Sequence, residues 1–135
     1  HKPDAWLRAM HVNVNAPFAL TQACLPLLTK AGDSAVVFVL DDPELLQRAH
    51  WGAYGASKAA LERFVAILHE ETDSSTLRTH AMLPGPMRTA LRQLAYFGED
   101  ILQRPLPDAA ASAAVYLLSA QGAAARGAIL DLRVA

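Results

Sequence analysis

Hydrophobic and polar positions along the chain alternate between long helical stretches and short apolar runs. From about 4 to 30 the hydrophobic residues recur at mostly helical spacing, which predicts a long helix bent at Pro17 and Pro26. Residues 35–40 form a continuous apolar run, which is typical of a strand covered on both faces. The polar residues 41–48 are expected to connect this strand to the next helix.

The rest of the chain repeats this alternation of helices and strands. The spacing predicts a long alanine-rich helix over about 51–71 and a strand over 76–83. A short helix is expected within 88–97, an alanine-rich helix over 107–120 and a last short strand over 128–132. Strands joined by helices run parallel, with right-handed crossovers. The predicted fold class is therefore α/β, part of a doubly wound parallel sheet with its ligand crevice at the carboxyl ends of the strands.

The composition is that of one domain folded around a core. The chain has 135 residues, of which 53% are hydrophobic and 19% charged, so residues 1–135 are predicted to form a single domain. Twelve Lys and Arg residues stand against thirteen Asp and Glu residues, giving a formal net charge of -1. This balance leaves no basic stripe for a phosphate backbone, which argues against nucleic acid as a partner.

Cysteine usage and hydropathy indicate a soluble, cytoplasmic protein. Cys24 is the one cysteine in the sequence, so no disulfide can form within the chain, and no Cys/His cluster at zinc spacing suggests a metal site. No apolar run reaches the length of a membrane span, and residues 1–4 lead into a helix and not into a signal-peptide apolar stretch. We therefore expect no membrane partner.

Three polar features lie at the expected crevice or on the helices beside it. Asn13 is polar within an apolar helix, and Tyr54 and Lys58 stand one turn apart on one helix face. Residues 84–89, Pro-Gly-Pro-Met-Arg-Thr, follow the strand that ends at Leu83. Each has an ordinary explanation by itself: a solvated asparagine, a chance pair, or a turn. Their order along the chain is more informative than any one of them.

Taken together, these features resemble the short-chain dehydrogenase/reductase family. The resemblance runs from about Trp6 to Leu132. Its motifs are Val-Asn-Val-Asn-Ala-Pro-Phe at 12–18, Trp-Gly-Ala-Tyr-Gly-Ala-Ser-Lys-Ala-Ala at 51–60, and the loop 84–89. It implies a Rossmann-type sheet and an oxidoreductase that uses NAD or NADP on a small-molecule carbonyl or alcohol substrate.

The chemistry of such a reaction explains the tyrosine and the lysine. A ketone becomes an alcohol when hydride reaches its carbon and a proton reaches its oxygen, so the site needs an acid beside the cofactor. A free tyrosine, with a pKa of about 10, is too weak unless its anion is stabilised. The ammonium of Lys58 is expected to lower the pKa of Tyr54. Tyr54 would then be both proton donor and proton acceptor.

The resemblance also implies roles for the other motif residues. Lys58 would hold the nicotinamide ribose hydroxyls, with Tyr54 beside it at the cofactor. Asn13 would hold a water molecule that passes protons to Lys58. The residues expected to lie against the nicotinamide carboxamide are Pro84, Gly85, Met87 and Thr89.

Position 41 departs from the family pattern. The family carries a serine about a dozen residues before the tyrosine, where its hydroxyl donates to the substrate carbonyl, and here that residue is Asp41. An ionised carboxylate only accepts hydrogen bonds, and its charge would raise the pKa of Tyr54. We expect a working site only if Asp41 is protonated or points away. Ser57 is no substitute, since small residues before the lysine are ordinary in the family.

Two readings of position 41 stay open. Asp41 and Asp42 could simply cap the turn after the strand, as aspartates often do. The protein could also be a catalytically silent relative that keeps the fold for binding or assembly. Asp41 favours that alternative, whereas Tyr54, Lys58 and Asn13 favour the enzyme.

A glycine-rich turn for the cofactor pyrophosphate is absent from this sequence. The seven glycines, at 32, 52, 55, 85, 98, 122 and 127, form no such turn. The chain therefore resembles the carboxyl half of the family fold without its amino-terminal strands. The strand at 35–40 would lack its inner neighbour, and this chain alone is expected to bind dinucleotide poorly and to be inactive.

The two long helices, 4–30 and 51–71, predict a homodimer. They carry apolar residues around more of their circumference than one sheet face can cover. In the family these helices pack against their symmetry mates, which implies an isologous dimer. Small residues that would permit a close approach are Gly52, Gly55, Ala56, Ala59 and Ala60.

Overall fold

A three-stranded parallel sheet forms the centre of the molecule. The computed structural model describes residues 2–133. Its strands are β1 (Ser34–Val39), β2 (Leu77–Leu83) and β3 (Ile129–Asp131). They lie in the order β1-β2-β3, and both pairings are parallel. The predicted strands, their direction and their places as neighbours are confirmed.

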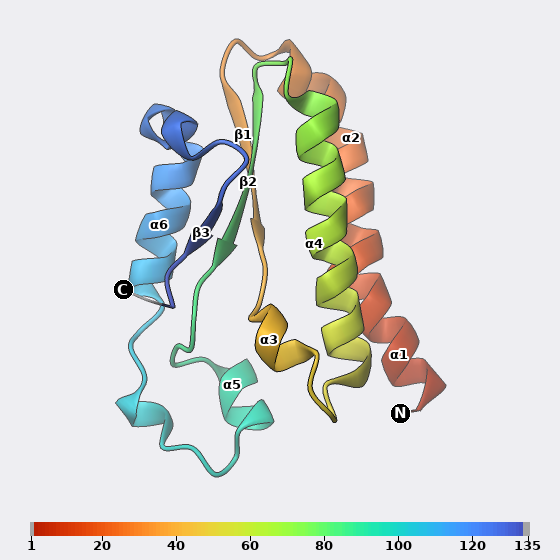
Figure 1. Cartoon of the computed structure of the whole chain (residues 1–135), viewed down its shortest axis with the longest axis vertical. Coiled ribbons are helices and arrows are strands. Elements are labelled where there is room, and N and C mark those ends of the chain that lie inside the picture. Colours follow the sequence, from red (N-terminus) through yellow and green to blue (C-terminus); the bar gives the residue numbers. More distant parts are fainter. Residues whose placement is uncertain (1, 134–135) are drawn as a thin grey trace.

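Helices cover both faces of the sheet (Figure 1). On one face lie α1 (Pro3–Met10) and α2 (Ala16–Lys30), beside α4 (Gly52–Thr72). On the other face lies α6 (Asp108–Leu118). A turn of 3-10 helix, Ala120–Ala125, leads from α6 to β3. Within residues 2–133, none of the helices combines the length and the apolar character needed to cross a membrane.

The main core lies between α4 and the sheet. One face of α4 contributes Leu61, Val65 and Leu68, which stand three or four positions apart as the sequence pattern predicts. The residues of the sheet and its rim that pack with them are Phe38, Leu40, Ala81 and Leu83. On the opposite face of the sheet, Leu117 of α6 is fully buried. In β1, Phe38 is buried, Val39 is exposed and the other residues are half-buried, so helices on both faces cover this apolar strand only in part.

The first long helix is interrupted at a place that differs from the prediction. Residues His11–Asn15 form a wider π-helical turn between α1 and α2, and the Ala16 N–H donates to the His11 carbonyl. Proline 17 has no N–H to donate to the carbonyl of Asn13 four residues earlier, which explains the irregular turn there. The helix continues through Pro26, and a bend at that proline stays a prediction.

Two short helices lie at the carboxyl ends of the strands, α3 (Pro43–Leu46) and α5 (Ala90–Ala95) (Figure 1). The polar connection expected at 41–48 therefore contains a helix, and Leu46 within it is buried. The Asp42 carboxylate caps α3 by accepting from two backbone N–H groups. The prediction that an aspartate caps the turn after the strand is confirmed for Asp42.

Glycine 55 allows α3 to approach α4 closely. A Cβ at this position would collide with the carbonyl oxygen of Leu46. Gly55 is buried, so its small size serves a contact within the chain. The sequence pattern instead predicts that Gly55 permits a close approach between two copies of the chain.

Candidate active site

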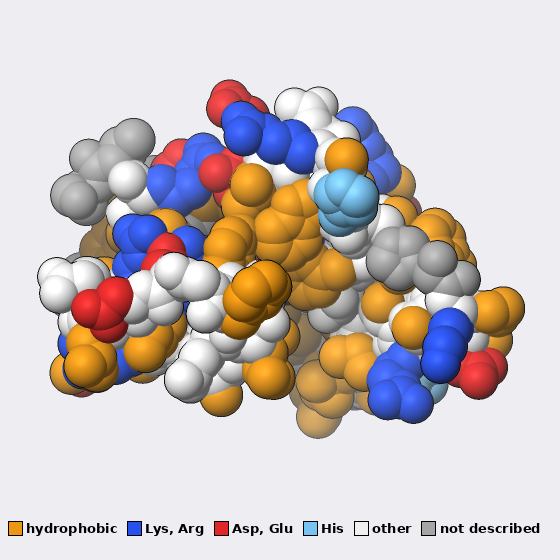
Figure 2. Space-filling view, turned by 90° about the horizontal axis from the view of Figure 1, so that it is seen from below, with side chains coloured by type: hydrophobic (Ala, Val, Ile, Leu, Met, Phe, Trp, Pro, Cys, Tyr) orange, Lys and Arg blue, Asp and Glu red, His pale blue; other side chains and the backbone are white. Residues whose placement is uncertain are grey.

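An open cleft of about 580 Å³ lies at the carboxyl ends of β1 and β2. Leu40 and Leu83, the residues where the two predicted strands end, both line it. The segment around α5 forms the opposite wall, through Leu91, Arg92 and Tyr96. Figure 2 looks onto this end of the molecule and shows hydrophobic side chains gathered in the middle of the face, with charged side chains toward its edges. The cleft is where the parallel-sheet rule predicts a ligand site.

Tyr54, Lys58 and Asp41 meet in this cleft. Tyr54 and Lys58 share one face of α4 because they stand one helical turn apart, and Asp41 follows the end of β1. The Tyr54 hydroxyl donates a 2.8 Å hydrogen bond to Asp41 Oδ2. Lys58 Nζ donates to the Val39 carbonyl at 2.9 Å and lies 5.8 Å from the centre of the Tyr54 ring.

The carboxylate, and not the ammonium, dominates the electrostatics of Tyr54. Burial raises the pKa of Tyr54 above its ordinary value, and the hydrogen bond and charge of Asp41 raise this pKa further. Burial lowers the pKa of Lys58, against the opposing effect of Asp41. The expectation that Lys58 lowers the pKa of Tyr54 is therefore wrong here. Of the two conditions for a working site, that Asp41 is protonated or that it points away, the second is not met, because Asp41 faces Tyr54 and accepts its hydrogen bond.

Asparagine 13 is linked to the active-site helix through Ser57. The Asn13 side-chain amide donates to Ser57 Oγ at 2.9 Å, and Ser57 Oγ donates to the Tyr54 carbonyl at 2.8 Å. Ser57 is 0% exposed and does not line the cleft. The Ser57 hydroxyl thus joins two helices and does not replace the missing serine, in agreement with the sequence analysis.

The loop after β2 also borders the cleft. Its cleft-lining residues are Pro84, Gly85, Pro86, Met87 and Thr89. Gly85 has a φ of 73°, a conformation that favours glycine, and it faces the backbone of Arg133. The Thr89 hydroxyl accepts from the Arg92 N–H at 3.2 Å and so caps α5. The loop is at the predicted place, and its contact with a nicotinamide stays a prediction.

An aromatic wall lies beside Tyr54 and is not predicted from the sequence. The ring of Trp51 lies 6.0 Å from that of Tyr54 and 5.8 Å from that of Tyr96. The Arg92 guanidinium lies 4.1 Å from the Tyr96 ring centre and donates to Glu99 at 2.6 and 2.9 Å. Trp51 belongs to the motif at 51–60, but nothing in the sequence around residue 96 indicates that the Tyr96 ring lies against Trp51.

Most charges that line the cleft are already paired. Arg133 binds Asp42 at 2.8 Å and Asp131 at 2.7 Å, and Arg92 is paired with Glu99. The charged pair that remains near the Tyr54 hydroxyl is Asp41 with Lys58. The cleft therefore offers apolar and aromatic surface with little unbalanced charge.

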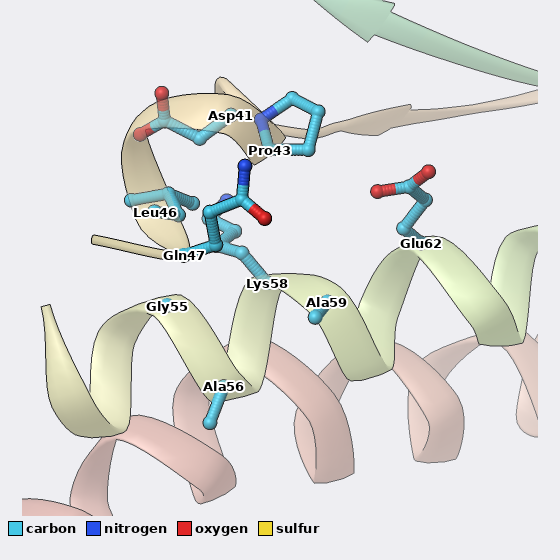
Figure 3. A pocket seen from close by; sticks show the side chains of 9 residues that line it. All are labelled: Asp41, Pro43, Leu46, Gln47, Gly55, Ala56, Lys58, Ala59 and Glu62. Carbon is cyan, nitrogen blue, oxygen red and sulfur yellow. The ribbon is translucent and has the colours of Figure 1, made fainter.

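A second, smaller hollow of about 210 Å³ lies between α3 and α4 (Figure 3). Asp41 and Lys58 border both this hollow and the main cleft. Its remaining lining residues are Pro43, Leu46, Gln47, Gly55, Ala56, Ala59 and Glu62. Asp41 thus borders both open spaces.

Known proteins are similar in sequence to this chain. The family model for short chain dehydrogenases matches residues 1–97. The uncharacterized oxidoreductase YciK of Escherichia coli strain K12 is 45% identical over 98 residues, which are 73% of this chain and 38% of that protein. The benzil reductase ((S)-benzoin forming) IRC24 of Saccharomyces cerevisiae is 32% identical over 94 residues, which are 69% of this chain and 36% of that protein.

A solved structure shares the fold. The crystal structure of a short chain dehydrogenase from Escherichia coli CFT073, complexed with NADPH, superimposes with a TM-score of 0.90 at 37% identity. The match covers 97% of this chain and 54% of that one, so this chain spans about half of that structure. The predicted α/β fold of the Rossmann type is confirmed. With a family match over residues 1–97 and this likeness over nearly its whole length, the chain belongs to the short chain dehydrogenase family.

Proposed function

We propose that the intact protein is an NAD- or NADP-dependent oxidoreductase that interconverts a carbonyl compound and its alcohol. The observation that supports this most is the placement of Tyr54 and Lys58 side by side in the cleft at the carboxyl ends of β1 and β2. The family and the NADPH complex of its E. coli member support the cofactor class. The lone Cys24 is consistent with a reducing, cytoplasmic setting.

The residues of the cleft fit the nicotinamide end of such a cofactor. The ammonium of Lys58 and the hydroxyl of Tyr54 are suited to ribose hydroxyls, and the loop 84–89 offers backbone groups for a carboxamide. The sequence holds no glycine-rich turn for a pyrophosphate, so this part of the cofactor would bind outside residues 1–135. When bound, the cofactor supplies or accepts the hydride. Asn13 would position the active-site helix through Ser57 and offer its carbonyl to a water molecule.

The test is turnover by the intact protein. Reduced NAD or NADP is mixed with a panel of ketones and aldehydes, and oxidised cofactor with the matching alcohols, while cofactor absorbance is followed. We expect turnover with at least one pair. Absence of turnover with every pair would support the second candidate, a catalytically silent relative. That candidate is favoured by the hydrogen bond that commits the Tyr54 proton to Asp41.

Neutral aromatic carbonyl compounds are the proposed substrate class. The rings of Trp51 and Tyr96 form one wall of the cleft, next to the Tyr54 hydroxyl. Aromatic rings favour other rings at such distances. The charges nearby are paired, which argues against a strongly anionic or cationic substrate. The name of the yeast relative, a benzil reductase, is consistent with an aromatic substrate.

Trp51→Ala should raise the KM for an aromatic ketone about 5- to 10-fold, because one ring–ring contact contributes about 1 kcal/mol. The KM for a small aliphatic ketone should change about 2-fold or less. Steady-state kinetics of the intact protein measures both. Phe97→Ala is the matched control, since Phe97 is 95% exposed and lies outside the cleft. Equal effects of Trp51→Ala on the two ketones would contradict the assignment.

A homodimer through α1, α2 and α4 is the proposed assembly. These helices and the π-helical turn between α1 and α2 expose large apolar residues: Trp6, Leu7, Val12, Phe18, Leu20, Leu27 and Ile67. Exposed apolar surface of this extent on neighbouring helices is typical of a protein–protein contact.

Sedimentation should show the intact protein as a dimer at micromolar concentration, and Leu20→Glu should weaken that dimer at least about 10-fold, because it buries an unpaired charge. Leu94→Glu on α5 is the control, since it makes the same change at another exposed leucine. A wild-type protein that sediments as a monomer would contradict the proposed assembly.

A further inference from the structure

The single hydroxyl proton of Tyr54 already has an acceptor. Tyr54 donates to Asp41 Oδ2 at 2.8 Å, and the Asp42 N–H donates to Asp41 Oδ1 at 2.8 Å. Both carboxylate oxygens are thus held in place. The Tyr54 oxygen keeps its lone pairs, so toward the cleft it can accept a hydrogen bond from an alcohol.

The other groups that the family resemblance links to proton transfer are bonded elsewhere. Lys58 Nζ donates to the Val39 carbonyl, and the Asn13 amide donates to Ser57. Within residues 2–133, Asp41 is the side chain that forms a hydrogen bond with the Tyr54 hydroxyl. A proton arriving at Tyr54 therefore has a direct path to Asp41.

Asp41 also has its own access to solvent. It is half-buried and borders the hollow between α3 and α4, although its carboxyl group is turned away from Ala59 and Glu62 (Figure 3). Because Asp41 is not fully buried, a proton on its carboxyl group can exchange with water.

We propose that Asp41 takes the Tyr54 proton when an alcohol is oxidised, so that Tyr54 passes a proton on and does not ionise. This inference rests on the proposed function. The alcohol O–H proton goes to Tyr54 Oη, and the Tyr54 proton goes to Asp41 Oδ2. The C–H electron pair leaves as hydride to the oxidised nicotinamide cofactor, and the carbon–oxygen double bond forms. Asp41 becomes neutral and then releases its proton to water.

The charges around the pair agree with this assignment. The raised pKa of Tyr54 disfavours a free tyrosinate beside Asp41, which makes transfer through Tyr54 the favourable route. Among the neighbouring charged groups, the Asp42 carboxylate and the Arg133 guanidinium form an ion pair with each other. The other charged and titratable groups that line the cleft and the hollow beside the pair are Lys58 and Glu62 of α4, Asp42 before α3, Arg133 after β3, and Arg92 and Tyr96 at α5.

The pH dependence of kcat/KM tests the proposal. In the wild-type pair the Asp41 carboxylate, and not a tyrosinate, is the proton acceptor, so the two reaction directions are compared between about pH 6 and pH 9. Alcohol oxidation should then be independent of pH, while carbonyl reduction, which needs the pair with its extra proton, should fall about tenfold per pH unit.

Asp41→Ser should change the slope of both profiles. Without the carboxylate, Tyr54 itself must ionise, so oxidation should rise about tenfold per pH unit up to the pKa of Tyr54, and reduction should be flat. Asp42→Asn is the matched control, because asparagine still caps α3 and Asp41 remains; it should keep the wild-type slopes. A wild-type protein with the slopes expected for Asp41→Ser would overturn the inference and leave the proposed function intact.

A second measurement needs neither cofactor nor turnover. The ultraviolet absorbance of tyrosinate is followed against pH in the wild type and in Asp41→Ser, each with and without Tyr54→Phe, so that the difference isolates Tyr54. We expect Tyr54 to ionise at lower pH in Asp41→Ser. Ionisation at the same pH in both proteins would overturn the inference. Absence of turnover in the intact protein would instead overturn the proposed function, and with it the oxidation step.

Discussion

Tyr54→Phe in the intact protein is expected to lower kcat by about 10²–10⁴-fold, the usual contribution of a general acid or base. The substitution removes the hydroxyl that faces both the cleft and Asp41. The ring remains to pack against Trp51, so the fold should be nearly unchanged, and because Lys58 still holds the ribose the loss of cofactor affinity should be much smaller than the loss of kcat. Turnover and cofactor titration measure the two quantities separately.

A matched control for this variant is Tyr116→Phe on α6. Tyr116 is a partly exposed tyrosine outside the cleft, so the same chemical change there should leave kcat unaltered. If Tyr54→Phe kept more than roughly a tenth of the wild-type kcat, Tyr54 would not be the group that exchanges a proton with the substrate.

Leu117→Ala is expected to destabilise the intact protein by about 2–5 kcal/mol, because it opens a cavity in a packed interior. Leu117 is 0% exposed, and its helix α6 packs against β1 on the face opposite α4. The loss of unfolding free energy within this range depends on how far the neighbouring side chains move in to fill the cavity. Denaturant unfolding measures it as a lower midpoint at an unchanged slope.

The adjacent residue provides the control for this prediction. Leu118 is 52% exposed, so Leu118→Ala should change the free energy of unfolding by about 0.5 kcal/mol or less. Equal losses for the two leucines would show that Leu117 does not fill an interior position.

The strands and the active-site helix could be predicted because their signals are local. The apolar run at 35–40 has no polar position to face water, which requires helices on both sides of β1. Tyr54 and Lys58 stand four positions apart, so a helix places them on one face whatever surrounds it. Parallel pairing then brings the ends of β1 and β2, and with them Asp41, to the same rim.

The remaining features depend on neighbours that are distant in the sequence. The pKa of Tyr54 depends on its burial and on which charged group lies next to its hydroxyl. Sequence spacing does not reveal that Lys58 Nζ donates to the Val39 carbonyl instead. Trp51 and Tyr96 come from separate segments joined by no periodic pattern. Pro17 leaves the carbonyl four residues before it without its usual partner, so the irregular turn lies before the proline and does not coincide with it.

The agreement between strand order in the sheet and strand order in the chain bears on biosynthesis. During translation β1 leaves the ribosome before β2, and β2 before β3, so each new strand meets a neighbour that already exists. None of the three has to be inserted between two finished strands. This part of the sheet can therefore grow outward in the direction of synthesis, with each helix emerging just before the strand that it delivers.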